Sequence, residues 1–297
     1  TSESRVERRS GNLDLKPERS KNFTAGVVFE PKLWPSKYGV LTATVDYWRI
    51  DQTDLVGIFG GTNQLIMDYY LRQIGSSNPN VVRAAPDAQQ IADGQAAGLA
   101  PVGNLVSIND VYLNLQPRTS EGVDYRLHYS LRRTPLGSFT WTLNASQWLK
   151  MYQEPNDDYQ VLLDALRDGV ISGVSVGGVE ELVRRNGRPE WKVTSTVTWR
   201  KDAWTVGLFS SYVGDYFDTS ANLAGTNDYW VVQDWTTHNL YVQYEVEKGP
   251  LSGTRLRIGA RNITNEEPPL ANERFGYDGR LHSNRGRWWY ATIRKEF

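Results

Sequence analysis

The last ten residues of the chain, Trp288 to Phe297, alternate between apolar and polar side chains. On an extended strand, one face of this segment carries Trp289, Ala291, Ile293 and Phe297. A period of two is typical of a strand with one buried face, and about ten residues are enough for a tilted strand to cross a bilayer. Soluble domains rarely stop on an aromatic residue within a strand, because their termini fray into water. We therefore expect this segment to be the closing strand of a membrane barrel.

Eight earlier segments show the same alternation, which gives nine expected strands in all. They lie at about 22–30, 39–50, 121–132, 138–150, 190–200, 203–214, 235–247, 254–264 and 287–297. Short connections around residues 33, 135, 201 and 250 alternate with long ones at 56–110, 154–189, 218–233 and 265–287. Outer-membrane barrels have short periplasmic turns and long extracellular loops. The pattern predicts an all-β, transmembrane antiparallel β-barrel whose loops contain short helices near 63–74 and 157–167.

The aromatic composition supports a surface that is apolar on one side and wet on the other. The chain contains 11 Trp and 16 Tyr but only 8 Phe, and Trp and Tyr suit such surfaces. Many of them fall near the ends of the expected strands, as in the aromatic girdles of membrane barrels. The chain has no run of about 18 apolar residues, which excludes a membrane-spanning helix. Its net charge of -1 gives no basic footprint for nucleic acid.

Several motifs resemble those of the TonB-dependent receptors, outer-membrane transporters with about 22 strands and a plugged lumen. Residues 11–18, Gly-Asn-Leu-Asp-Leu-Lys-Pro-Glu, are similar to the family's Asn-Pro-x-Leu-Lys-Pro-Glu signature, with Leu13 where Pro is usual. Residues 261–269 resemble the family's Asn-Leu-x-(Asp/Asn)-(Lys/Glu)-x-Pro element. Tyr277-Asp278, Gly286-Arg287 and the terminal Phe297 complete the C-terminal pattern. Lys295 departs from it, on the apolar face, where we expect its amine to snorkel toward the periplasmic end.

The resemblance implies that residues 1–297 are the C-terminal portion of a receptor barrel. An odd strand number is unusual for such barrels, so the plug domain and the N-terminal strands are expected upstream. The implied function is TonB-dependent import of a scarce ligand across the outer membrane of a Gram-negative bacterium, driven by the proton-motive force. A ferric siderophore is favoured, and an oligosaccharide comes next. The implied partners are outer-membrane lipid, the plug, the TonB complex and the barrel-assembly machinery, which would read Phe297. No catalytic residue and no cofactor is implied.

Two groups of side chains are candidates for the ligand site. The loop aromatics could stack on an aryl siderophore or on a sugar ring; they are Tyr69, Tyr70, Tyr216, Tyr229, Trp230, Phe275 and Tyr277. The lumen-facing arginines could attract an anionic ligand; they are Arg126, Arg255, Arg257 and Arg261. The alternatives are girdle or loop packing for the aromatics, and pairing with acids of the plug or of neighbouring strands for the arginines.

Other classes of site have weaker support in the sequence. His128, His238 and His282 lie on separate strands or loops without metal-ligand spacing. A barrel phospholipase needs a Ser and a His close together at the outer barrel edge; His128 and Ser130 share a face, but such a pair is common by chance. The acidic group near Glu154 lacks the ligand pattern and the glycine of a calcium loop. The remaining alternative is a soluble carbohydrate-binding β-protein, which explains the aromatics but not the one-sided loop lengths.

Overall fold

The computed structural model describes residues 6–32, 35–98, 100–223 and 228–295. Phe297, the expected assembly signal, lies outside the described residues. The chain forms two compact units, each built from separate stretches of sequence. One comprises Thr1–Lys21, Asp51–Thr119 and Tyr152–Glu181, and is called the loop unit below. The other comprises Asn22–Ile50, Ser120–Met151 and Leu182–Phe297, and is called the sheet unit.

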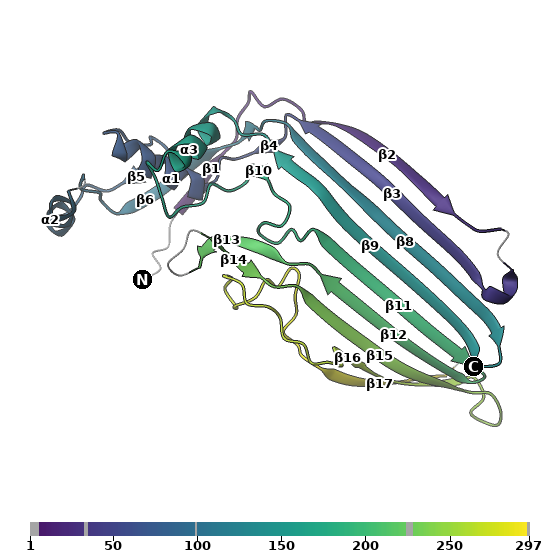
Figure 1. The fold of residues 1–297 in the computed structure, drawn as a ribbon. Coiled ribbons are helices and arrows are strands. Elements are labelled where there is room, and N and C mark those ends of the chain that lie inside the picture. Colours follow the sequence, from purple (N-terminus) through teal and green to yellow (C-terminus); the bar gives the residue numbers. More distant parts are fainter. Residues whose placement is uncertain (1–5, 33–34, 99, 224–227, 296–297) are drawn as a thin grey trace. The chain divides into compact units, whose positions relative to one another are not determined.

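The sheet unit contains nine long strands that lie side by side in chain order (Figure 1). They are β2 (Arg19–Phe29), β3 (Val40–Thr53), β8 (Arg118–Thr134), β9 (Gly137–Gln153), β11 (Trp191–Lys201), β12 (Trp204–Val213), β15 (Trp235–Val246), β16 (Thr254–Arg261) and β17 (Trp288–Lys295). The pairs from β9 to β17 are antiparallel. All nine expected strands are therefore confirmed. Within the described residues, β2 and β17 form the two edges of an open sheet.

The connections alternate in length as expected. The short turns hold residues in the left-handed region of φ that closes tight hairpins: Gly137 between β8 and β9 has φ 103°, and Asp202 between β11 and β12 has φ 48°. The 3-10 helix η1 (Ser36–Tyr38) connects β2 to β3. One long connection differs from the expectation, because residues 218–233 do not form a simple loop. They contribute to a hairpin of β13 (Tyr216–Asn222) and β14 (Tyr229–Val232).

The two faces of the sheet have opposite character. On one face Val206 of β12 pairs with Val242 of β15, which pairs in turn with Ile258 of β16. Ile258 is 62% exposed and Ile293 of β17 is 76% exposed, so this apolar face is uncovered. A sheet in water would cover such a face. The exposed face therefore indicates that lipid surrounds it.

The opposite face is polar and carries large aromatic rings that lie close to the backbone. The space beside Gly207 on β12 is filled by the ring of Tyr241, and the space beside Gly259 on β16 by the ring of Tyr290. A side chain at either glycine would collide with the ring, at 2.2 Å from Tyr241 and 2.6 Å from Tyr290. Glycine at these positions thus allows bulky residues to lie flat on the lumen wall.

Lys295 of β17 does not leave its charge in the apolar layer. Its Nζ donates hydrogen bonds to the carbonyl oxygens of Pro250, at 3.3 Å, and Ser252, at 2.6 Å. Both acceptors belong to the short turn between β15 and β16. Reaching a polar end in this way is the snorkelling that the sequence predicted.

The loop unit has an ordinary buried core. Its elements are a three-stranded sheet of β1 (Val6–Ser10), β6 (Leu105–Val111) and β5 (Val81–Arg83), the short pair β4 (Val56–Gly57) and β7 (Leu113–Asn114), β10 (Glu180–Glu181), and the helices α1 (Gly61–Gln73), α2 (Ala88–Ala97) and α3 (Asp157–Arg167). The core consists of Phe59, Ile66, Tyr159, Leu162, Ala165, Ile171, Val176 and Val179. The two expected helices are confirmed as α1 and α3. In the described part of the chain, no helix is long and apolar enough to span a membrane, a result that does not bear on β-barrels.

Candidate ligand-binding site

At the long-loop end of the sheet unit, the segment that follows β16 packs onto the hairpin of β13 and β14. Tyr216, Val232 and Ala271 form the small buried core between them, and Leu281 packs against it. The indole N–H of Trp230 donates to the carbonyl of Leu270 at 2.9 Å. The two loops therefore form one packed structure.

The Asp278 carboxylate holds this structure together. Its side chain is 2% exposed and accepts hydrogen bonds from the Tyr216 hydroxyl, at 3.2 Å, and from Nε and a terminal nitrogen of Arg280, both at 2.8 Å. The bonds from Arg280 are the main reason why the pKa of Asp278 lies below its usual value, although burial opposes them. Burial and the neighbouring Asp278 charge raise the pKa of Tyr216. At neutral pH, an ionised carboxylate and a neutral phenol are thus the stable pair.

A cleft of about 480 Å³ lies between this loop segment and the ends of β15, β16 and β17; we call it the loop-end cleft. It brings together two of the predicted ligand residues, Arg261 and Tyr277. Trp235, His282 and Arg285 also line it, and the sequence analysis did not select them as ligand residues. No spacing motif marks these three, because they meet only when the loop packs onto the strand ends.

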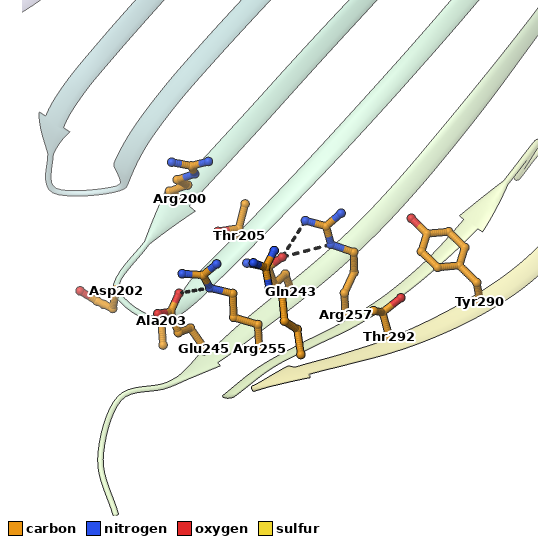
Figure 2. A pocket seen from close by; sticks show the side chains of 11 residues that line it. Arg200, Asp202, Ala203, Thr205, Gln243, Glu245, Arg255, Arg257, Tyr290 and Thr292 are labelled. Carbon is orange, nitrogen blue, oxygen red and sulfur yellow. Dashed lines mark hydrogen bonds and ion pairs between the residues drawn. The ribbon is translucent and has the colours of Figure 1, made fainter. Parts of the chain in front are cut away.

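A second cleft, of about 600 Å³, lies on the polar face near the short-turn end and contains two predicted residues, Arg255 and Arg257. Figure 2 shows three of its arginines, Arg200 on β11 and Arg255 and Arg257 on β16. Arg257 donates to the Gln243 amide oxygen at 2.7 and 3.1 Å, and its guanidinium lies 4.2 Å from the Tyr241 ring centroid. Arg255 forms an ion pair with Glu245 at 3.1 Å. With Arg200, Arg294 and Asp202 also lining it, this cleft has more positive than negative groups.

The remaining predicted arginine, Arg126, lies elsewhere on the polar face. Its Nε donates to the Asn144 side chain at 3.2 Å, and both residues line a third, smaller cleft with Asp46 and Asp124. The negative charges of Asp46 and Asp124 offset the positive charge of Arg126 in this cleft. Arg126, Arg257 and Arg261 therefore occupy three separate clefts and do not form one cluster.

The predicted aromatics also separate. Tyr69 and Tyr70 lie on α1 of the loop unit, where Tyr69 is 41% exposed and Tyr70 packs against the core. Tyr216 is only 2% exposed because it belongs to the core between the loops. Tyr229 and Trp230 lie on β14, and Trp230 lines a further cleft. Phe275 is 77% exposed beneath the guanidinium of Arg274.

The three histidines have unrelated surroundings. His128 bonds the Thr142 hydroxyl at 3.2 Å, not Ser130, and His238 lies 2.8 Å from the Ser210 hydroxyl. His282 is buried in the loop-end cleft. Among the described residues, no group of three or more His, Cys, Asp or Glu side chains is arranged to hold a metal ion.

Comparison with known proteins assigns the family. The family described as "TonB dependent receptor-like, beta-barrel" matches residues 3–263. The chain therefore belongs to the TonB-dependent receptor β-barrel family, a family of outer-membrane receptors and transporters. This assignment removes the soluble carbohydrate-binding alternative. It also makes the long-loop end of the sheet extracellular and the short-turn end periplasmic. Among curated proteins, no sequence matches the chain.

Solved structures share the fold at low sequence identity. The siderophore receptor PirA from Acinetobacter baumannii aligns with a TM-score of 0.52 and 15% identity, over 96% of this chain and 32% of PirA. A mutant of the ferric enterobactin receptor PfeA from Pseudomonas aeruginosa, in complex with enterobactin, aligns with a TM-score of 0.51 and 17% identity, over 96% of this chain and 32% of that receptor. The chain thus spans about a third of the length of these receptors.

Proposed function

We propose that this chain forms the C-terminal part of the barrel of a receptor that imports a ferric siderophore across the outer membrane. The observation that carries the proposal is the chemistry of the loop-end cleft. Among the described residues, its lining contains two arginines and several aromatic side chains but no acid. Such a lining attracts an anionic ligand that carries flat rings. PirA and PfeA, which share the fold, are described as a siderophore receptor and a ferric enterobactin receptor.

Within this proposal, the predicted ligand residues have different roles. Arg261 and Tyr277 would bind the ligand at the extracellular end. Phe275 and Tyr69, which are exposed on loops, would meet it as it arrives. Arg257 and Arg126 lie further along the lumen wall and would attract the ligand or bind acids of the plug. Tyr216 would act indirectly, by holding the loop through Asp278.

The energy source for import and the insertion into the outer membrane would be those of the TonB-dependent receptor family. The plug domain, expected upstream, would fill the lumen and couple to the TonB complex and the proton-motive force. The arginine-rich cleft of Figure 2 lies on the lumen wall at the periplasmic end, where acidic plug residues could pair with Arg200. The barrel-assembly machinery would recognise the C-terminal strand that ends in Phe297.

Uptake in cells tests the proposal. A strain without the receptor should lose energy-dependent uptake of radioactive iron bound to one class of siderophore, and the complete receptor gene should restore it. A strain that lacks TonB should behave like the deletion strain. An oligosaccharide is the second candidate, favoured by the exposed Phe275 ring, which suits stacking on a sugar. Loss of growth on an oligosaccharide with unchanged iron uptake would replace the siderophore with a sugar.

A further inference from the structure

Two residues that line the loop-end cleft, Trp235 and His282, carry buried polar atoms with no hydrogen-bond partner among the described residues. In the described part of the chain, five buried side-chain nitrogen or oxygen atoms lack a hydrogen bond, and three of them are on these two residues. They are both ring nitrogens of His282 and the indole nitrogen of Trp235. A buried polar group without a partner destabilises the folded state, because it has lost its hydrogen bonds to water. Three such atoms gathered at one cleft indicate that something else satisfies them.

His282 is fixed in its position. Its backbone N–H donates to the Asp278 carbonyl at 2.9 Å, and its ring is 5% exposed. The ring lies parallel to that of Tyr216 and meets the edge of Trp235, with centroids 5.5 Å apart in the second pair. Burial lowers the pKa of His282, so the imidazole is neutral at pH 7 and offers one N–H donor and one acceptor. The loop thus presents a preformed hydrogen-bonding group.

The Asp278 carboxylate, whose charge acts on His282, is paired with Arg280, and the charged side chains that line the cleft itself are those of Arg261 and Arg285. The Arg261 guanidinium lies 4.9 Å from the Trp288 ring centroid, and this cation–π contact holds the guanidinium in place. Neither Arg261 nor Arg285 has a side-chain hydrogen bond or ion pair within the described residues. Among the described residues that line the cleft there is no Asp or Glu, so the charged N–H groups of Arg261 and Arg285 have no charged acceptor in the lining. The cleft is therefore built to receive acceptor atoms.

We propose that the loop-end cleft is a subsite for a planar pair of anionic oxygens on the transported ligand, with His282 and Trp235 as its buried donors. The chemistry is that of a carboxylate or of two phenolate oxygens on one ring. A guanidinium donates two parallel hydrogen bonds to such a pair, and the rings of Trp288 and Tyr277 provide flat apolar walls. A neutral sugar offers no charge to the arginines. The inference rests on the proposed import function and specifies which part of the ligand binds here.

Binding by the complete receptor, purified in detergent, tests the subsite directly. The probes are dihydroxybenzoate, its ferric complex and maltotriose, titrated calorimetrically. We expect the ferric complex to bind, and both Arg261→Gln and His282→Phe to weaken it about tenfold each. His282→Gln, which restores a donor and an acceptor, should recover part of the affinity. The matched control is His238→Gln, on β15 and outside the cleft, which should bind like the wild type.

The outcomes separate the subsite from the proposed function. Equal affinity of the wild type, Arg261→Gln and His282→Phe for the probe would overturn the subsite, as would binding of maltotriose alone. Arg261 is exposed, so its substitution remains informative even where His282→Phe disturbs the loop. Weakened probe binding in the variants, together with unaltered iron uptake in the deletion strain, would keep the subsite and overturn the import proposal.

Discussion

The loop unit and the sheet unit place their apolar side chains in opposite ways. In the loop unit, Leu162 is 0% exposed and Ile171 1% exposed, inside a core built from residues far apart in the sequence. In the sheet unit, Ile258 is 62% exposed and Ile293 is 76% exposed, in a continuous apolar face. The two units are therefore suited to different solvents. The loop unit excludes water from its core, and the outer face of the sheet contacts lipid. The difference predicts that the same substitution has different effects in the two units.

The largest contrast should come from truncating an aliphatic side chain. Leu162→Ala should lower the free energy of unfolding of the loop unit by about 2–5 kcal/mol, because it leaves a cavity in a packed core. Ile258→Ala on the exposed face should change the free energy of unfolding of the sheet unit by no more than about 0.5 kcal/mol, because lipid tails fill the vacated space. Hydrogen exchange of the α3 and β16 amides in micelles measures both. Equal losses of protection at the two sites would contradict the two-solvent interpretation.

A charge introduced on adjacent residues of β11 should distinguish the two faces of the sheet. Val197 is 39% exposed on the apolar face, and Thr196 lies on the polar face. Val197→Arg should destabilise the barrel by about 2–4 kcal/mol near the bilayer midplane, and Thr196→Arg should leave it nearly unchanged. Denaturant unfolding of the complete receptor from lipid vesicles gives the two values. A larger loss for Thr196→Arg would mean that the faces have been assigned the wrong way round.

Breaking an ion pair should also destabilise the loop unit more than the sheet unit. Asp68 of α1 is 0% exposed and bonds Arg72 and Arg83, each at 3.0 Å. Burial alone would raise its pKa, but hydrogen bonds from Arg72, the Asn78 backbone and Arg83 outweigh burial and lower it. The stabilisation is therefore complete above the unfolded pKa of about 3.9 and is lost as the pH falls through the lower folded value.

Asp68→Ala should accordingly cost the loop unit about 1–3 kcal/mol at pH 7 and little at the most acid pH. In the sheet, Glu245 is half exposed to the lumen beside Arg255, and Glu245→Gln should cost at most about 1 kcal/mol. Limited digestion by an acid-active protease, followed from pH 5 downward, measures the loop unit. If the wild-type loop unit became more resistant to the protease as the pH falls, the Asp68 carboxylate would not stabilise it in the way proposed.

The smallest expected effect concerns the one charged side chain that β17 carries on the apolar face. Lys295→Met removes two hydrogen bonds to the Pro250 and Ser252 carbonyls but adds apolar surface in lipid. The net loss should be about 0.5–1.5 kcal/mol, with local loss of amide protection in the turn at residues 250–253. Unchanged exchange in that turn would show that Lys295 does not stabilise it.

The strands were predictable because their signal is local. Alternation within ten residues already shows which side chains share a face, and the real bounds differ from the expected ones by only a few residues. The helix α2 was missed because its Ala- and Gln-rich sequence lacks an apolar stripe. Its start is marked by a capping box between Asp87 and Gln90, a signal that was present in the sequence.

The site was less predictable, because its contacts join distant residues. The Tyr216 hydroxyl bonds Asp278 across 62 positions, and no periodicity connects them. Arg261 and Tyr277 were selected for their chemistry, and the structure places them together. His282 was noticed only as one of three scattered histidines. Its importance depends on burial and on missing partners, which a sequence does not show.

The division of the loop unit into three stretches has a consequence for the order in which this chain can fold. Asn63 bonds the Gly177 backbone across 114 positions and the Tyr159 hydroxyl across 96. The intervening sequence includes the whole of β8 and β9. Contacts this distant form slowly, because a long loop must close before they stabilise anything. We therefore expect the loop unit to fold late. It should remain unfolded through synthesis and export, and fold only after the hairpin of β8 and β9 has formed and brought residues 152–181 next to the earlier two stretches.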